Sequence, residues 1–119
     1  MHQRIAKIWG QEIILHNATY CAKLLQYDGA RTSSRHYHKE KHETFVVLRG
    51  MFDIEWYHVD VPDIKSAKRF GPGSCLVLAP YTVHRVQCLS PEGGTIVEAS
   101  SHDDPEDCVR LTPSVNPFG

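Results

Sequence analysis

The stretch HYHKEKHETFVVLRG, residues 36–50, places several metal-ligand side chains directly before a β-forming run that stops at a glycine. His36 and His38 are two residues apart, so in an extended segment both side chains leave the same face. Two imidazoles on one face can converge on a single cation. Glu43 follows a short charged turn, from which its carboxylate can lie beside the two imidazoles. This stretch predicts part of a divalent metal site.

A fourth ligand must come from elsewhere in the chain. His84 suits that role because it follows the bend at Pro80 and begins another extended segment. Three neutral imidazoles and one carboxylate suit one divalent ion such as Zn, Mn, Fe, Ni or Co, and the residue types do not choose among them. His42 is an alternative third histidine, although its place in the turn favours a solvated side chain.

The competing interpretation is that the His-x-His pair decorates a surface strand, which is the more common outcome for such a pair in isolation. The added glutamate and the distant histidine favour the metal site. The remaining histidines are expected to be exposed or hydrogen-bonded in loops; they are His2, His16, His58 and His102.

Short apolar or alternating segments separated by glycine and proline turns fill the rest of the chain, which favours an all-β fold. No helical stripe of useful length occurs. The segment 60–69 contains a proline and mixed charge and is expected to be an excursion between strands, and the chain after residue 113 is expected to fray. The expected strands are 13–15, 20–27, 32–38, 44–48, 51–58, 74–79, 84–89 and 95–100.

The bulk composition excludes several classes of protein. A length of 119 residues suits one domain, 1–119, that can bury a core without disulfides. The net charge of −1 lacks the basic excess that nucleic-acid binding needs. No apolar run approaches the ~20 residues that span a bilayer. The charged N-terminus does not read as a signal peptide, so we expect a cytoplasmic protein.

Four cysteines are spread along the chain without a Cys-x-x-Cys pair: Cys21, Cys75, Cys88 and Cys108. Without a secretion signal, buried free thiols are favoured over a disulfide or a thiolate site.

These residues resemble the two motifs of the cupin family. In the first, Gly29 precedes His36-Tyr37-His38, Glu43 follows after four residues, and Gly50 after six more. The interval from Gly29 to His36 is one residue longer than usual. Gly73 and the segment 79–84 are similar to the second motif. Ala79 occupies the position where the family usually has proline, and Tyr81 the position where it usually has glycine. Cys88 stands where the family has asparagine.

The likeness extends over about residues 7–111, leaving 112–119 as a tail. Residues 7–12 resemble the Pro-Trp-Gly opening of small sugar-phosphate isomerase-like cupins and of the C-terminal domain of bifunctional mannose-6-phosphate isomerases. Residues 20–24 are similar to their next strand, and 106–110 to their closing Asp-x-x-Arg segment. The resemblance implies a double-stranded β-helix, or jelly-roll barrel, that holds the metal with His36, His38, Glu43 and His84.

Three functions follow from that resemblance. The first is aldose–ketose isomerisation or epimerisation of a sugar or sugar phosphate, which needs a cation to polarise a carbonyl and a group that moves a proton. The second is a carbohydrate-binding or sensing protein without catalysis. The third is an Fe(II) oxygenase, or a metal-dependent lyase that uses Tyr57 or Tyr81; packing is the simpler role for both tyrosines.

Lys23 and Glu98 are the candidate acid–base residues, because each stands among apolar neighbours in an expected strand. The alternative is a structural ion pair or exposure to solvent. Lys39 and Arg85 could attract phosphate, but strand alternation points both away from the metal face. The resemblance also implies a homodimer, for which the apolar segment 13–15 is the candidate edge.

Overall fold

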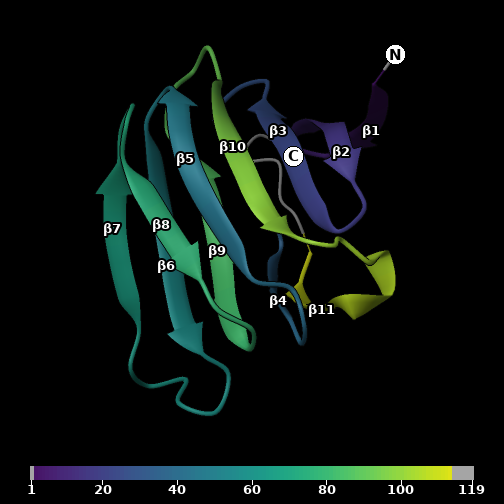
Figure 1. The fold of residues 1–119 in the computed structure, drawn as a ribbon. Coiled ribbons are helices and arrows are strands. Elements are labelled where there is room, and N and C mark those ends of the chain that lie inside the picture. The colour runs from purple at the N-terminus through teal and green to yellow at the C-terminus, as the bar shows by residue number, and fades with distance from the viewer. Residues whose placement is uncertain (1, 114–119) are drawn as a thin grey trace.

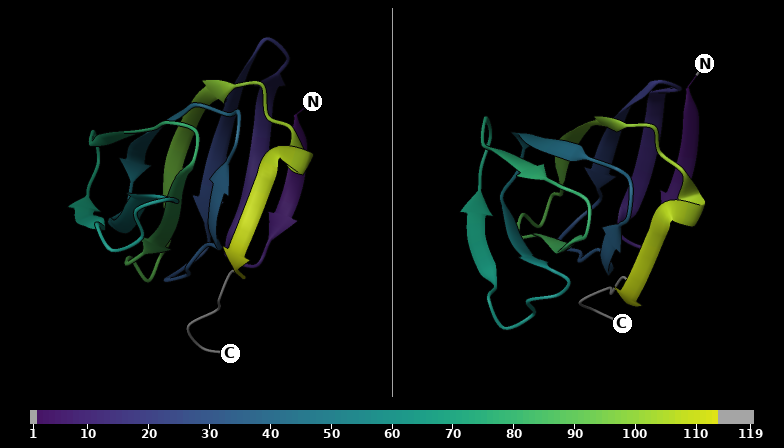
Figure 2. Two further views of the ribbon diagram at one scale, coloured as in Figure 1. Left: turned by 90° about the horizontal axis from the view of Figure 1, so that it is seen from below. Right: turned by 60° about the horizontal axis from the view of Figure 1, so that its bottom comes forward.

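The computed structural model describes residues 2–113, which form two antiparallel sheets facing one another as two layers (Figures 1 and 2). A single 3-10 turn, η1 (Pro105–Asp107), precedes the last strand. The strands are β1 (Gln3–Lys7), β2 (Gly10–Asn17), β3 (Tyr20–Tyr27), β4 (Arg35–His38), β5 (Glu43–Arg49), β6 (Phe52–His58), β7 (Ser66–Phe70), β8 (Cys75–Leu78), β9 (Thr82–Cys88), β10 (Gly94–Ser101) and β11 (Cys108–Thr112).

The spatial order of the strands within each sheet differs from their order along the chain. One sheet has the order β1-β2-β3-β10-β5-β8, and the other β11-β4-β9-β6-β7. Neighbours far apart in sequence, such as β3 and β10, therefore lie side by side (Figure 1). The all-β prediction is confirmed, and the expected strands coincide with described strands within one or two residues at most boundaries.

Alternation along the strands builds the core between the sheets. In β3 every second side chain is buried, from Cys21 to Tyr27, and in β5 the buried positions begin at Glu43 and continue through Phe45. The apolar part of this interior comprises Trp9, Leu25, Tyr27, Phe45, Val47, Phe52, Ile54, Phe70, Leu78, Val86, Cys88 and Ile96. Charged residues that share this inward face are therefore carried into the interior.

Two expectations about the sheets are wrong. The segment 13–15 is not at an edge, because β2 lies between β1 and β3, and the Gln3–Lys7 strand occupies the edge instead. The segment 60–69 is not wholly an excursion, because Ser66–Phe70 pairs with β6. Strands β1, β7 and β11 were missed because all three are edge strands with few or no buried side chains, so they show no apolar alternation.

Gly93 illustrates how closely the chain approaches itself at a turn. Its φ of +88° lies in the left-handed region, and a Cβ added there would lie 2.1 Å from the carbonyl oxygen of Tyr27. Only glycine satisfies both conditions.

The predicted tail, 112–119, is described only as far as residue 113, and Thr112 belongs to β11. The fraying expected after Pro113 concerns residues that lie outside the described part of the chain. Between residues 2 and 113, no helix is long and apolar enough to cross a membrane.

Candidate metal centre

Two neighbouring strands of the smaller sheet bring three histidines together. His36 of β4 stands directly opposite His84 of β9, and their ring centroids are 4.4 Å apart. His38, two residues along β4, has its ring centroid 5.3 Å from that of His36 and 6.1 Å from that of His84. His36 and His38 were predicted to leave the same face of the strand. Their rings lie near each other, and both lie near the ring of His84 from the neighbouring strand.

Glu43 joins this group from the opposite sheet, at the start of β5. Its Oε2 atom lies 3.3 Å from Nε2 of His84 and 3.7 Å from Nε2 of His38. His38, Glu43 and His84 offer ligand atoms that are all within 4.8 Å of one another. The structure thus brings three of the four predicted ligands into one set. The fourth, His36, is not in that set, although its ring lies against that of His84.

The donor atoms of this group fit a divalent cation. Glu43 Oε2 and His84 Nε2 are both buried and have no hydrogen-bond partner among the described residues. Leaving two buried polar atoms unpaired is costly, on the order of 1–3 kcal/mol each. A cation held between nitrogen and oxygen donors would satisfy both atoms.

A backbone contact orients the ring of His84. Its Nδ1 lies 3.1 Å from the carbonyl oxygen of Thr82, and a protonated Nδ1 that donates to this carbonyl leaves the Nε2 lone pair available as a ligand. Nδ1 of His36 lies 3.1 Å from the carbonyl oxygen of Ser34 and 2.9 Å from the hydroxyl of the same residue. Ser34 therefore positions the His36 ring, while its hydroxyl can either donate to or accept from Nδ1.

Burial keeps the imidazoles in the neutral form that binds metal. It lowers the pKa of His38 and of His84 to about 4, and it places the pKa of His36 well below the usual value. Burial has the opposite effect on the carboxyl group: together with the nearby charge of Glu98, it raises the pKa of Glu43. A bound cation would counter that rise by favouring the carboxylate.

Lys41 holds the other oxygen of Glu43 and was not predicted. Its buried Nζ lies 3.1 Å from Glu43 Oε1, 3.0 Å from Glu98 Oε2 and 2.8 Å from Asp103 Oδ1. In the sequence it stands in a charged run that suggests a solvated turn. Its position two residues before Glu43 could have indicated this contact, because side chains two residues apart in extended chain lie on the same face.

The closing segment of the chain shapes the turn that carries Lys41. The carboxylate of Asp107 accepts backbone N–H groups from Lys39, Glu40 and Lys41 at 2.9, 3.0 and 3.0 Å respectively. These bonds fix the connection between β4 and β5. Residues nearly 70 positions apart in the sequence thereby determine where the Lys41 ammonium group and the following Glu43 carboxylate lie.

Lys23 and Glu98, the predicted acid–base residues, face one another across β3 and β10 and are both buried. Nζ of Lys23 lies 3.1 Å from Glu12 Oε1 and 2.7 Å from Asp103 Oδ2. Glu98 Oε2 accepts hydrogen bonds from Lys41 Nζ at 3.0 Å and from Ser100 Oγ at 2.9 Å. Both therefore lie inside the barrel, each held by partners that the sequence did not reveal.

These charges form one connected set, here called the acid–lysine network: Glu12, Lys23, Lys41, Glu43, Glu98 and Asp103. Asp103 bridges the two lysines, and its backbone is held by Asn17, whose side-chain amide makes two 2.9 Å hydrogen bonds to it. Burial alone would raise the pKa of Asp103, but the charge of Lys41 and the hydrogen bond from Lys23 bring it below the usual range.

The candidate ligands and the network line one cavity of about 590 Å³, which is the size of a small-molecule site. Apolar side chains such as Trp9, Leu25 and Phe45 form part of its wall. Lys7 and Arg110 also line it. The cavity therefore combines an apolar wall, buried charges and metal-ligand side chains.

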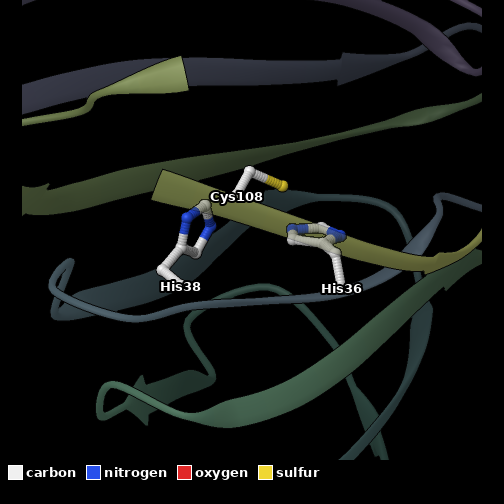
Figure 3. Close-up of side chains that lie close together, drawn as sticks. All are labelled: His36, His38 and Cys108. Atoms are coloured by element: carbon white, nitrogen blue, oxygen red, sulfur yellow. The ribbon is translucent and has the colours of Figure 1, made fainter. Parts of the chain in front are cut away.

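Cys108 also lies at this centre. It stands opposite His38 in the pairing of β11 with β4, and its Sγ lies within 4.8 Å of ligand atoms of His36 and His38. Figure 3 shows the three side chains gathered at the start of β11. The expectation that all four cysteines are buried is wrong: Cys21 and Cys88 are, but Cys75 is exposed and Cys108 half-buried, although all four are free thiols.

Other residues singled out from the sequence lie outside the cavity. His42 is exposed, and its backbone N–H donates to Ser101 Oγ at 3.0 Å. Lys39 is exposed and Arg85 lines a separate hollow with Asp53 and Glu55, as strand alternation predicted. The lining of the cavity includes neither Tyr57, which is buried, nor Tyr81, which is exposed. The four histidines expected to be outside the centre, His2, His16, His58 and His102, are exposed.

Comparison with known proteins finds similarity in structure only. No protein-family model and no curated protein sequence matches the chain. The capsular polysaccharide assembling protein CapF from Staphylococcus aureus superposes with a TM-score of 0.83 at 16% identity, over 94% of this chain and 34% of CapF. Oxalate decarboxylase from Bacillus subtilis gives 0.79 at 14% identity, over 92% of this chain and 30% of the enzyme.

The third similar structure is close to this chain in length. KdgF from Halomonas sp. superposes with a TM-score of 0.72 at 19% identity, and the match covers 89% of this chain and 89% of KdgF. This chain thus spans about a third of CapF and of oxalate decarboxylase but most of KdgF. At these sequence identities, structural similarity supports a shared fold but does not indicate a shared activity. The two facing antiparallel sheets and these superpositions establish that the chain has the cupin fold, a double-stranded β-helix of the jelly-roll type.

Proposed function

We propose that the chain binds one divalent metal ion through His36, His38, Glu43 and His84. The single observation that carries this proposal is the pair of buried, unpartnered atoms, Glu43 Oε2 and His84 Nε2, which lie 3.3 Å apart. Their neighbours are neutral imidazoles with lowered pKa values, which is the protonation state of a metal-binding histidine.

The proposed activity is aldose–ketose isomerisation or epimerisation of a sugar or sugar phosphate. A bound divalent ion would supply Lewis-acid polarisation of a carbonyl oxygen. The remaining work is proton transfer: a proton is taken from the carbon beside the carbonyl and returned to a carbon of the same molecule. No oxidant or reductant is consumed.

Glu98 and Lys23 carry the charges that this transfer needs, but both pKa shifts lead away from neutrality, which weakens Glu98 as a base and Lys23 as an acid. Burial alone would raise the pKa of Glu98, but the charges of Lys41 and Lys23 lower it, so the side chain is a carboxylate that accepts a proton. Burial alone would lower the pKa of Lys23, but Glu98 and Glu12 raise it, so the side chain stays an ammonium group that donates one. Both line the cavity with the proposed ligands.

Lys7 and Arg110 are suited to the phosphate end of such a substrate. Both line the cavity, and among residues 2–113 Arg110 forms no ion pair, whereas Lys7 has only a 3.8 Å contact with Glu12. Cations that are not already neutralised by acids are the groups that attract a phosphate. The buried lysines, by contrast, are each held by two or more carboxylates.

The second candidate function is sugar binding or sensing without catalysis. It is favoured by the acid–lysine network itself, in which every predicted acid–base group already has partners within about 3 Å. A network of that kind also fixes a barrel interior without performing chemistry. The lyase alternative receives less support, because neither Tyr57 nor Tyr81 lines the cavity. Oxygen uptake by the Fe(II)-loaded protein tests the oxygenase alternative.

Pairing into a homodimer in the cytoplasm stays a prediction. The six-stranded sheet ends at β1 and β8, which are the strands that edge-to-edge pairing would use. Sedimentation of the purified chain tests it, since a monomer at all concentrations would contradict it.

The metal proposal is tested by elemental analysis of protein purified without chelator. We expect about one equivalent of a divalent ion, which is lost in His84→Ala and retained in His42→Ala, the exposed neighbour. A native chain that carries no ion and takes none up contradicts the proposal. For the isomerase proposal, the loaded protein is assayed on aldose phosphates; sugar binding without turnover selects the second function.

A further inference from the structure

The cavity contains a second set of possible metal donors that shares His38 with the first. His36, His38 and Cys108 each offer a ligand atom, and these atoms lie within 4.8 Å of one another (Figure 3). The set is assembled by strand pairing, because Cys108 of β11 stands opposite His38 of β4. This placement differs from that of Cys75, whose side chain is on the exposed face of β8.

A second observation marks this set as more than a neighbouring thiol. His38 is 7% exposed, and its buried Nδ1 has no hydrogen-bond partner among the described residues. The nearest carboxylate oxygen, Asp107 Oδ2, is 3.9 Å away, beyond hydrogen-bond distance. A buried imidazole nitrogen without a partner among the described residues, beside a thiol and a second imidazole, leaves donor capacity that a cation would use.

The kind of donor gives Cys108 a reason to ligate. The three histidines offer neutral nitrogen donors, and Glu43 contributes one carboxylate oxygen while the other contacts Lys41 at 3.1 Å. A thiolate adds a soft, charged donor beside two of these imidazoles. Thiolates prefer zinc-like ions to manganese or magnesium.

We infer that Cys108 is a metal ligand in this chain together with His36 and His38, so that the cavity takes a thiophilic divalent ion such as Zn²⁺ or Co²⁺ with a sulfur donor. The inference rests on the proposed metal-binding function and narrows it. On binding, the Cys108 S–H bond breaks, the sulfur lone pair forms the bond to the metal, and the proton leaves to solvent. No electron transfer takes place.

The test is the absorption spectrum of the full chain titrated with Co²⁺. A thiolate bound to Co²⁺ produces an intense sulfur-to-metal charge-transfer band in the near ultraviolet, separate from the weaker visible bands of any Co²⁺ site. We expect this band in the native chain and in Cys75→Ser, a matched control at an exposed cysteine. We expect Cys108→Ser to lack the band and to bind Zn²⁺ at least about tenfold more weakly.

Alkylation provides a second readout that does not depend on the spectrum. We expect Zn²⁺ to protect Cys108 from iodoacetamide, read by peptide mass spectrometry, while Cys75 stays reactive. Visible Co²⁺ bands without the charge-transfer band, or alkylation of Cys108 at the same rate with and without Zn²⁺, overturn the inference and leave the proposed metal function standing. A chain that binds neither ion overturns both.

Discussion

Lys41 and Glu43 form a 3.1 Å ion pair that leaves one carboxylate oxygen for the metal centre. Lys41 Nζ contacts Oε1, whereas Oε2 points toward His38 and His84 and has no hydrogen-bond partner among the described residues. The lysine thus presents Glu43 to the centre through one oxygen. It also joins the centre to the rest of the acid–lysine network through Glu98 and Asp103.

We expect Lys41→Met to lower the free energy of unfolding by about 3–5 kcal/mol, because it leaves buried carboxylates without a compensating charge. Urea denaturation measures the change. Lys39→Met is the matched control: its side chain is exposed two positions away and should change stability by less than about 0.5 kcal/mol. Equal stability of the two variants contradicts a structural role for the buried ammonium group.

The stability of the metal-free chain should fall as the pH is lowered from about 6.5 to about 4. The folded-state pKa of His38 and of His84 is about 4, below the usual 6.5 of an unfolded histidine. The lowered pKa of His36 acts in the same sense, whereas the raised pKa of Glu43 acts in the opposite sense. Three imidazoles outweigh one carboxyl group, so within that window the unfolded chain binds more protons than the folded chain and acid favours unfolding.

The measurement is the free energy of unfolding in the presence of a chelator, across that pH window. His84→Asn should flatten the pH dependence, because one buried imidazole no longer titrates differently in the two states. His102→Asn, at an exposed histidine, should leave it as in the native chain. If the native chain and His84→Asn have the same slope, the buried His84 imidazole is not a cause of the acid sensitivity.

Glu98→Gln should reduce any turnover of an aldose phosphate by on the order of 10²–10⁴-fold, the contribution of a positioned acid–base group. The metal content should stay at the native level, because Glu98 is not among the proposed ligands. Ser100→Ala removes only the hydroxyl that donates to Glu98 Oε2 and should cost much less. Full activity in Glu98→Gln, and likewise in Lys23→Met, excludes these two residues as the acid–base pair.

Gly93→Ala should destabilise the fold by more than about 2 kcal/mol, since it combines an unfavourable positive φ with a backbone clash. The added Cβ would lie 2.1 Å from the carbonyl oxygen of Tyr27. Gly73→Ala is the control, because Gly73 has the same φ of +88° but no atom within 4 Å of an added Cβ. We expect it to cost about 1 kcal/mol. Equal costs in urea denaturation contradict the clash.

By itself, the sequence was enough to predict an all-β chain, and it named His36, His38, Glu43 and His84 as candidate metal ligands, all of which line one cavity. Alternation, turn residues and same-face spacing are local properties, so they can be read without knowing which strands become neighbours. The same local rule identified Lys23 and Glu98 as inward-facing charges. It failed for β1, β7 and β11, because edge strands with largely exposed side chains have no apolar face to reveal them.

Only the tertiary structure decided which groups surround those residues. Lys41 meets Glu98 and Asp103 across 57 and 62 positions of sequence, and Asp103 reaches Lys23 across 80. Cys108 reaches His38 only because β11 returns to pair with β4. Such contacts depend on which strands become neighbours and on how the loops close. The same local sequence pattern is compatible with many strand orders, and burial of the whole core selects one of them. No short stretch of the chain therefore encodes these contacts.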